Sequence, residues 1–134
     1  MIGLDTNVLV RYLAQDDVQQ SALATRLIEN GLNAATPGFI SVVVLVELCW
    51  VLKRLYGATE PELVETATDL LGSARFQVEN RAVVQAAVQR IRMLKSKGGL
   101  TDHLIVEIAK AQGCTHTVSF DKAAVRSAGM RLLA

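Results

Sequence analysis

The chain has 134 residues, which is typical of one domain, so we expect a single unit spanning residues 1–134. Hydrophobic residues make up 51% of it, and the formal net charge of +1 shows no gross basic excess of the kind that announces a nucleic-acid binder. No apolar run approaches the roughly 20 residues of a membrane helix, and the charged N-terminus does not resemble a signal peptide. These features predict a soluble, cytoplasmic protein without membrane contact.

The spacing of apolar residues predicts strands and helices that alternate along the chain. In chain order we expect strands at 2–4, 39–40, 75–78, 116–120 and 130–134. Between them we expect helices at 6–14, 18–30, 42–56, 60–71, 82–95 and 101–112, and a short helix from 121. Ser41 is a candidate helix cap, and Thr59 with Glu62 matches a capping box.

Strands that are separated by helices predict a parallel sheet, because parallel neighbours need crossover connections. The expected fold class is therefore α/β, with three α/β/α layers around a central, mostly parallel sheet of about four to five short strands.

The two cysteines, Cys49 and Cys114, have no spacing typical of a zinc site or a disulfide framework, so we expect packing residues in a reducing cytosol. A domain of this size folds without a metal, so any metal here serves chemistry.

Two acidic residues directly follow predicted strands. Asp5 follows the strand at 2–4 and Asp121 follows the strand at 116–120, so both lie at the carboxyl end of a parallel strand, where open α/β sheets form their ligand crevice. We therefore expect the two carboxylates to lie near each other. For either residue alone, a role limited to capping a helix remains open.

Glu47 is the one residue between positions 42 and 52 that is not apolar. Because its neighbours one helical turn away are apolar, we expect its carboxylate in a partly dry environment. A buried charge requires a cationic partner, a raised pKa, or a cation that it shares with other carboxylates. A structural ion pair and a metal site both remain open for this residue.

Asp102 begins the predicted helix at 101–112 and aligns with Ile105 and Val106 on its inward stripe, so we expect it to face the interior. His103 lies on the opposite stripe and is expected to be solvated. Helix capping by Thr101 or Asp102 is the alternative role.

The four acids carry more information together than singly, because three of them end loops at one edge of the predicted sheet and the fourth interrupts a core helix. Clustered carboxylates repel one another unless protons or a metal intervene. Hard oxygen donors around a crevice suit Mg²⁺ or Mn²⁺, which can also engage phosphate oxygens. A divalent-cation site is therefore expected.

Four short segments carry a resemblance to a known family. GLDTNVLV, SVVVLVEL, TDHLI and TVSFDK, in that order, resemble the four acidic motifs of the PIN domain family, and the nearest match is the VapC group of bacterial type II toxins. The resemblance covers the whole chain. It implies a metal-dependent endoribonuclease in which Asp5, Glu47, Asp102 and Asp121 are the catalytic residues and the ligands of Mg²⁺ or Mn²⁺, and in which a metal-activated water hydrolyses the phosphodiester bond.

The same resemblance matches Asn7 and Ser119 to the family's polar helpers and leaves Thr6 a structural role as a helix cap. Relatives often carry a further acid three residues before the acid of the third motif, and this chain has Gly99 there, so a second metal is expected to bind weakly.

The resemblance also implies partners. Toxins of this group form homodimers, cleave RNA and are silenced by a cognate VapB-like antitoxin whose C-terminal segment covers the active site. The high apolar fraction and the helix at 59–71 are compatible with a dimer contact, although ordinary core packing explains both equally well.

Basic residues are the candidate contacts for RNA phosphates. The 14 basic residues outnumber the 13 acidic ones by only one. Metal binding at the four acids would offset their negative charge and leave the positive electrostatic field of the basic residues. The candidates are Arg11, Lys53, Arg54, Arg90 and Arg92, with Lys95 and Lys97 beside the last two. A solvated helix face is the alternative role for each.

Three other classes of protein share some of these features. A receiver-type signalling domain is expected to carry paired acids after its first strand, where this chain has Asp5 alone. A phosphatase with a nucleophilic aspartate needs a second acid two residues later, where this chain has Asn7. A catalytically silent PIN-like binding module is the third alternative, and the complete set of four acids argues against it.

Overall fold

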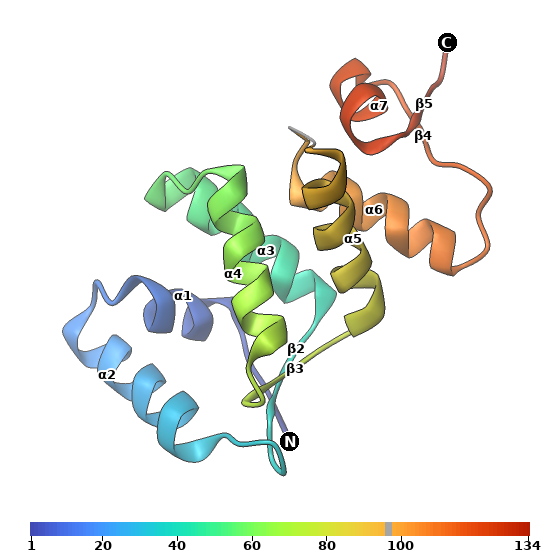
Figure 1. Ribbon diagram of the computed structural model, residues 1–134. Coiled ribbons are helices and arrows are strands. Elements are labelled where there is room, and N and C mark those ends of the chain that lie inside the picture. Colours follow the sequence, from blue (N-terminus) through green and yellow to red (C-terminus); the bar gives the residue numbers. More distant parts are fainter. Residues whose placement is uncertain (96–97) are drawn as a thin grey trace.

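Figure 1 shows the computed structural model of the protein, which describes residues 1–95 and 98–134. Strands and helices alternate along it as the sequence predicts. The strands are β1 (Ile2–Gly3), β2 (Gly38–Ile40), β3 (Phe76–Val78), β4 (Val118–Ser119) and β5 (Arg131–Leu132). The helices are α1 (Thr6–Ala14), α2 (Val18–Arg26), α3 (Val42–Tyr56), α4 (Glu60–Gly72), α5 (Arg81–Leu94), α6 (Leu100–Ala111) and α7 (Lys122–Ala128), with a π-helical segment η1 at Leu27–Gly31.

The strands form two parallel sheets. β1, β2 and β3 lie in that order in one sheet, in which Ile2 is opposite Gly38 and Gly38 is opposite Phe76, while β4 and β5 pair with each other in the second. The α/β class with parallel strands is confirmed. The expectation that all strands share one sheet is not met, because β4 does not pair with β1 in the described structure.

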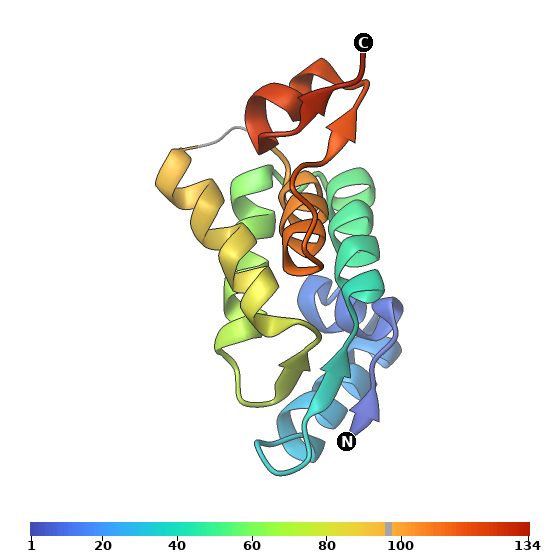
Figure 2. The same cartoon turned by 90° about the vertical axis from the view of Figure 1, so that its right-hand side faces the viewer.

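A separate small core explains this division. Val106 of α6 packs with Ala124 and Ala128 of α7 and with Met130, so the β4–α7–β5 segment is held against α6. Figures 1 and 2, two views at right angles, both place this segment at the opposite end of the molecule from β1. The carboxyl ends of β1 and β4 consequently do not meet.

The main core joins the first sheet to helices α1, α3, α4, α5 and α6, and it includes Ile28 of η1. Helix α3 contributes one continuous face to it, formed by Leu45, Leu48, Cys49 and Leu52. The apolar side of α4 belongs to the same core, so packing within the chain accounts for it. No helix in the described ranges is both long and apolar enough to cross a bilayer.

Local capping follows the sequence at two helices. The Ser41 hydroxyl accepts a hydrogen bond from the amide of Val44 at 3.1 Å, and the Thr59–Glu62 capping box is present at α4.

The cysteine prediction is half right. Cys49 is a buried packing residue, and burial raises the pKa of its thiol to about 11, whereas Cys114 is exposed.

Replacement of Leu48 tests the main core. Its side chain is fully buried one residue after Glu47, so Leu48→Ala should lower the free energy of unfolding by about 2–5 kcal/mol through lost burial and a residual cavity. Val43→Ala on the same helix is the control, because Val43 is 77% exposed and its loss should have little effect. Urea denaturation of both variants measures the difference, and equal effects would contradict the burial assigned to α3.

Candidate functional site

Asp5 lies between β1 and α1. It is exposed, has extended backbone angles and is the N-cap of α1, where its Oδ1 accepts a hydrogen bond from the Thr6 amide at 2.8 Å. Capping therefore belongs to Asp5, and the expectation that Thr6 is the cap is wrong. Within the described chain Oδ2 of Asp5 accepts no hydrogen bond, so this carboxylate caps the helix through one oxygen and keeps the other available.

Glu47 lies in the middle of α3 and is exposed, so the expectation of a partly dry environment is wrong. The physical reason is that α3 is covered on one face only, which leaves Val43 and Trp50 as well as Glu47 in contact with solvent. Glu47 forms no ion pair with any residue that the structure describes. A structural ion pair is thereby removed as its explanation.

Asp5 and Glu47 line one pocket of about 270 Å³ between α1 and α3. Asn7 and Thr6 also line it, and Asn7 carries a side-chain amide oxygen. Thr6 is only 4% exposed, and its Oγ1 has no hydrogen-bond partner among the residues described. Two carboxylates with further hard oxygen donors fit one Mg²⁺ or Mn²⁺, since Mg²⁺ is commonly held by one or two carboxylates and completes its shell with water.

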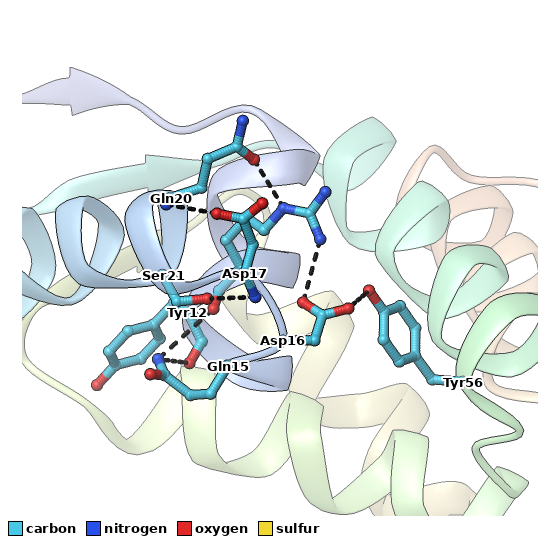
Figure 3. Close-up of polar contacts among 8 residues, drawn as sticks. Tyr12, Gln15, Asp16, Asp17, Gln20, Ser21 and Tyr56 are labelled. Atoms are coloured by element: carbon cyan, nitrogen blue, oxygen red, sulfur yellow. Dashed lines mark hydrogen bonds and ion pairs between the residues drawn. The ribbon is translucent and has the colours of Figure 1, made fainter.

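A charged network borders this pocket. Arg11, which also lines it, donates from Nε to Gln20 at 2.7 Å and forms an ion pair from Nη1 to Asp16 at 3.1 Å. The hydroxyl of Tyr56, at the end of α3, donates to the other oxygen of Asp16 at 2.6 Å, and the two side chains face each other in Figure 3. The network ties α3 to the α1–α2 connection and orients the Arg11 guanidinium, and Arg11 lines the same pocket as Asp5.

The same hydrogen bond shifts the ionisation of both partners. It lowers the pKa of Asp16 below its ordinary value and raises the pKa of Tyr56, because it stabilises the carboxylate form of one and the protonated form of the other.

Asp102 lies in the first turn of α6 and is half-buried. It lines a different pocket of about 400 Å³, together with Trp50, Lys53 and Glu60. The N-cap of α6 is Gly99, so neither Thr101 nor Asp102 caps this helix. Asp102 therefore carries a charge at the helix N-terminus, which the helix dipole favours, without being committed to a capping bond.

The orientation predicted for α6 is only partly right: Val106 is buried as expected, but two other residues are not placed as predicted. His103 was expected in solvent and is fully buried, while Ile105 was expected inside and is 46% exposed. The reason is that α5 packs against the side of α6 that carries His103 and Leu104. Burial, and then the charge of Arg90, lower the pKa of His103, which favours its neutral form.

Asp121 is the N-cap of α7 and lies apart from the other acids. Its Oδ1 accepts hydrogen bonds from the amides of Ala123 at 2.8 Å and Ala124 at 3.4 Å, and its own amide donates to Ser119 Oγ at 2.9 Å. The expected proximity to Asp5 is not found, because β4 pairs with β5 in the second sheet. Ser119 thus contacts Asp121 within the C-terminal segment.

The four predicted acids are thus distributed over three places. Asp5 and Glu47 share a pocket, Asp102 lies in a second pocket on another side of α3, and Asp121 lies on the C-terminal segment. In the described ranges no three acidic, histidine or cysteine side chains are close enough together to hold a metal ion. The structure supplies half of the expected ligand set at one point.

The basic candidates fall into two groups. Arg11 and Lys53 line the two acidic pockets, and Arg54 lies beside them on α3, with its guanidinium carbon 5.6 Å from the centre of the Trp50 ring. Arg90 and Arg92 lie on α5, where Arg90 is half-buried and Arg92 donates to Thr68 Oγ1 at 3.1 Å. Lys95 is exposed, and the predicted contact at Lys97 falls outside the described residues.

Comparison with known proteins decides the family. A family model described as "PIN domain" matches residues 2–129, almost the whole chain. The chain belongs to the PIN domain family. PIN domains form a nuclease superfamily, so the resemblance seen in the four acidic segments is confirmed at the level of the family.

A search of solved structures returns the crystal structure of FitAcB from Neisseria gonorrhoeae. The alignment has 17% sequence identity and a TM-score of 0.34, and it covers 100% of this chain and 97% of that chain. No match was found among curated proteins. The assignment to the PIN domain family rests on the family model.

Two residues of this PIN domain escaped the sequence reasoning. Asp16 and Tyr56 are 40 residues apart, and no local pattern announces their contact. Asp17, the next residue, is the N-cap of α2: its side chain accepts a hydrogen bond from the Gln20 amide at 2.8 Å. The sequence does contain one signal: two adjacent acids precede α2, and a helix needs only one of them as its N-cap, so the other is available for a different contact.

Removal of the Tyr56 hydroxyl tests the network. In Tyr56→Phe the pKa of Asp16 should rise toward its ordinary value of 3.8, because its principal hydrogen bond is lost. A depressed carboxyl pKa stabilises the fold above the unfolded-state pKa, and this contribution disappears as the pH falls through the folded-state pKa. Tyr56→Phe should therefore be less stable than the parent near neutral pH and equally stable in acid.

NMR titration of the Asp16 carboxyl carbon and urea denaturation at both pH values provide the measurements. Tyr12→Phe is the matched control, because no hydrogen bond of the Tyr12 hydroxyl is found in the described part of the chain. An unchanged Asp16 titration in Tyr56→Phe would show that the network does not persist in solution.

Proposed function

We propose that the protein is a Mg²⁺- or Mn²⁺-dependent endoribonuclease, and that it is the toxin of a type II toxin–antitoxin pair. The observation that carries this proposal is the pocket in which Asp5 and Glu47 lie together, with no ion pair to either carboxylate among the described residues. Membership of a nuclease superfamily is the second support.

In this proposal Asp5 and Glu47 hold the cation, and Asn7 binds its waters. A bound divalent ion lowers the pKa of a coordinated water and neutralises charge on the transferring phosphate. The chain itself offers no histidine nucleophile in the pocket, because His103 is buried and His116 lies near β4 beside Thr115. The Asp5–Glu47 pocket therefore serves to bind and orient, and water is the attacking group.

Arg11 is the proposed phosphate contact nearest to the two carboxylates. Its ion pair with Asp16 and its hydrogen bond to Gln20 hold the guanidinium plane beside the pocket before RNA arrives. An arginine that is oriented in advance loses less side-chain entropy on binding a phosphate, and its planar fork matches phosphate oxygens.

Asp102 and Asp121 complete the proposed set of acids. β1 pairs only with β2 and β4 only with β5 in the described structure, so each sheet has a free edge. Pairing of β4 with the free edge of β1 would carry Asp121 toward Asp5. We include this closure in the proposed active arrangement.

The proposed partners are an RNA substrate, a VapB-like antitoxin and a second copy of the chain. Val43, Trp50 and Leu55 are exposed on α3 around Glu47, so an apolar surface borders the acidic pocket. An antitoxin segment that covers the pocket would also bury this apolar surface. Arrest of bacterial growth on expression, relieved by the product of an adjacent small reading frame, is the expected outcome in cells.

Substitution of the two pocket acids tests the activity. Asp5→Asn and Glu47→Gln should each reduce Mn²⁺-dependent cleavage of an RNA panel by about 100-fold or more, since each removes a proposed metal ligand. Glu29→Gln, an exposed acid outside the pocket, is the control. Cleavage that survives both substitutions, or that persists in chelator, would disprove the mechanism.

Glu47→Gln should preserve or raise the melting temperature in chelator, because it removes a charge that has no partner.

Asp121→Asn tests the proposed closure. Asparagine accepts the same amide hydrogen bonds at the start of α7, so the fold should be retained while a metal ligand is lost. We expect thermal unfolding close to that of the parent, together with a loss of cleavage comparable to that of Asp5→Asn. Full activity in this variant would show that the β4–α7–β5 segment takes no part in the site.

A further inference from the structure

The N-terminus of α6, which carries Asp102, lacks a cap from its own sequence. Its N-cap residue is Gly99, which has no side chain to accept a hydrogen bond. The first amides of any α-helix have no partner within the helix and need one from outside. Here Oε2 of Glu60 accepts a hydrogen bond from the Leu100 amide at 3.1 Å, although Glu60 is 40 residues away, in the first turn of α4.

The other oxygen of Glu60 binds a third helix. Oε1 accepts from Nζ of Lys53 on α3 at 2.8 Å, so one carboxylate joins α3, α4 and α6. Lys53, Glu60, Gly99 and Asp102 line the same pocket. The hydrogen bond to Glu60 raises the pKa of Lys53, and the charge of Asp102 has a smaller effect in the same direction.

Gly99 lies close against the Glu60 side chain, and its backbone conformation does not require a glycine. Its φ of −72° is open to any residue, but a Cβ there would lie 3.3 Å from Oε1 of Glu60, tighter than an ordinary van der Waals contact. A Cβ at position 99 would therefore require the Glu60 carboxylate to shift by a few tenths of an ångström. The glycine allows Glu60 to approach the start of α6 without this shift.

We propose that Glu60 is a positioning residue of the candidate nuclease site: it fixes the first turn of α6, which carries Asp102, and it holds Lys53 away from Asp102. Without Glu60, Lys53 would pair with the Asp102 carboxylate and compete with a metal for it. This inference rests on the proposed function, since it assigns Asp102 to metal binding. It adds a fifth acid that acts through its neighbours and does not itself bind the metal.

Mn²⁺ titration by calorimetry tests the proposal without requiring cleavage. Glu60→Ala should weaken Mn²⁺ binding about 10-fold, as expected when a residue that orients a metal ligand is removed. Thr59→Ala is the matched control, because it removes the capping box one residue earlier on α4 and leaves Glu60 in place. It should lower stability and leave Mn²⁺ affinity unchanged.

Two double variants separate the effects of Glu60. Gly99→Ser in the Glu60→Ala background supplies a local N-cap at the vacated place, so it should restore amide exchange protection in the first turn of α6 and part of the Mn²⁺ affinity. Lys53→Ala in the same background removes the competitor of the metal and should restore a further part. Added Mn²⁺ should also recover RNA cleavage by Glu60→Ala, since its defect lies in metal binding.

The outcomes distinguish this inference from the proposed function. Equal Mn²⁺ affinities of the parent and Glu60→Ala, or an equal loss in Thr59→Ala, would overturn the role of Glu60 even if RNA is cleaved. Mn²⁺ binding that depends on Glu60 in a protein that cleaves no RNA would overturn the nuclease and retain the positioning role. A parent protein that binds no Mn²⁺ would overturn both.

Discussion

The packing of α3 into the main core is the constraint on which both acidic pockets depend. Leu45, Leu48, Cys49 and Leu52 anchor one face of the helix, and this burial determines where every other residue of α3 lies. Glu47 is thereby placed opposite Asp5, Tyr56 reaches Asp16, and Lys53 reaches Glu60. One buried face thus organises two pockets on different sides of the same helix.

The carboxylates around these pockets combine structural and chemical roles. Asp5 and Asp121 each cap a helix through Oδ1, which leaves the second oxygen of each without a hydrogen bond among the described residues. Glu60 uses both of its oxygens to join three helices. Capping and ligand binding are therefore compatible functions of one aspartate, and the choice between them that the sequence suggested does not arise.

Much of the local structure is predictable from the sequence. The α1 bounds, the capping box of α4 and the start of α7 at Asp121 follow from caps and apolar spacing, because these signals act over one or two helical turns. The orientation of α6 is not predictable in this way. Its amphipathic pattern admits two faces, and the side that carries His103 became buried because α5 packs there.

The sequence by itself determined the alternation of strands and helices, the family to which the chain belongs and the acids that carry its motifs, since all of these reside in local patterns of residue type. Only the tertiary structure decided which acids meet. Asp5 joins Glu47 because α1 and α3 pack together, whereas Asp121 remains apart because Val106, Ala124 and Met130 hold its segment on α6. Contacts between residues far apart in the chain depend on how whole helices pack, which no short motif specifies.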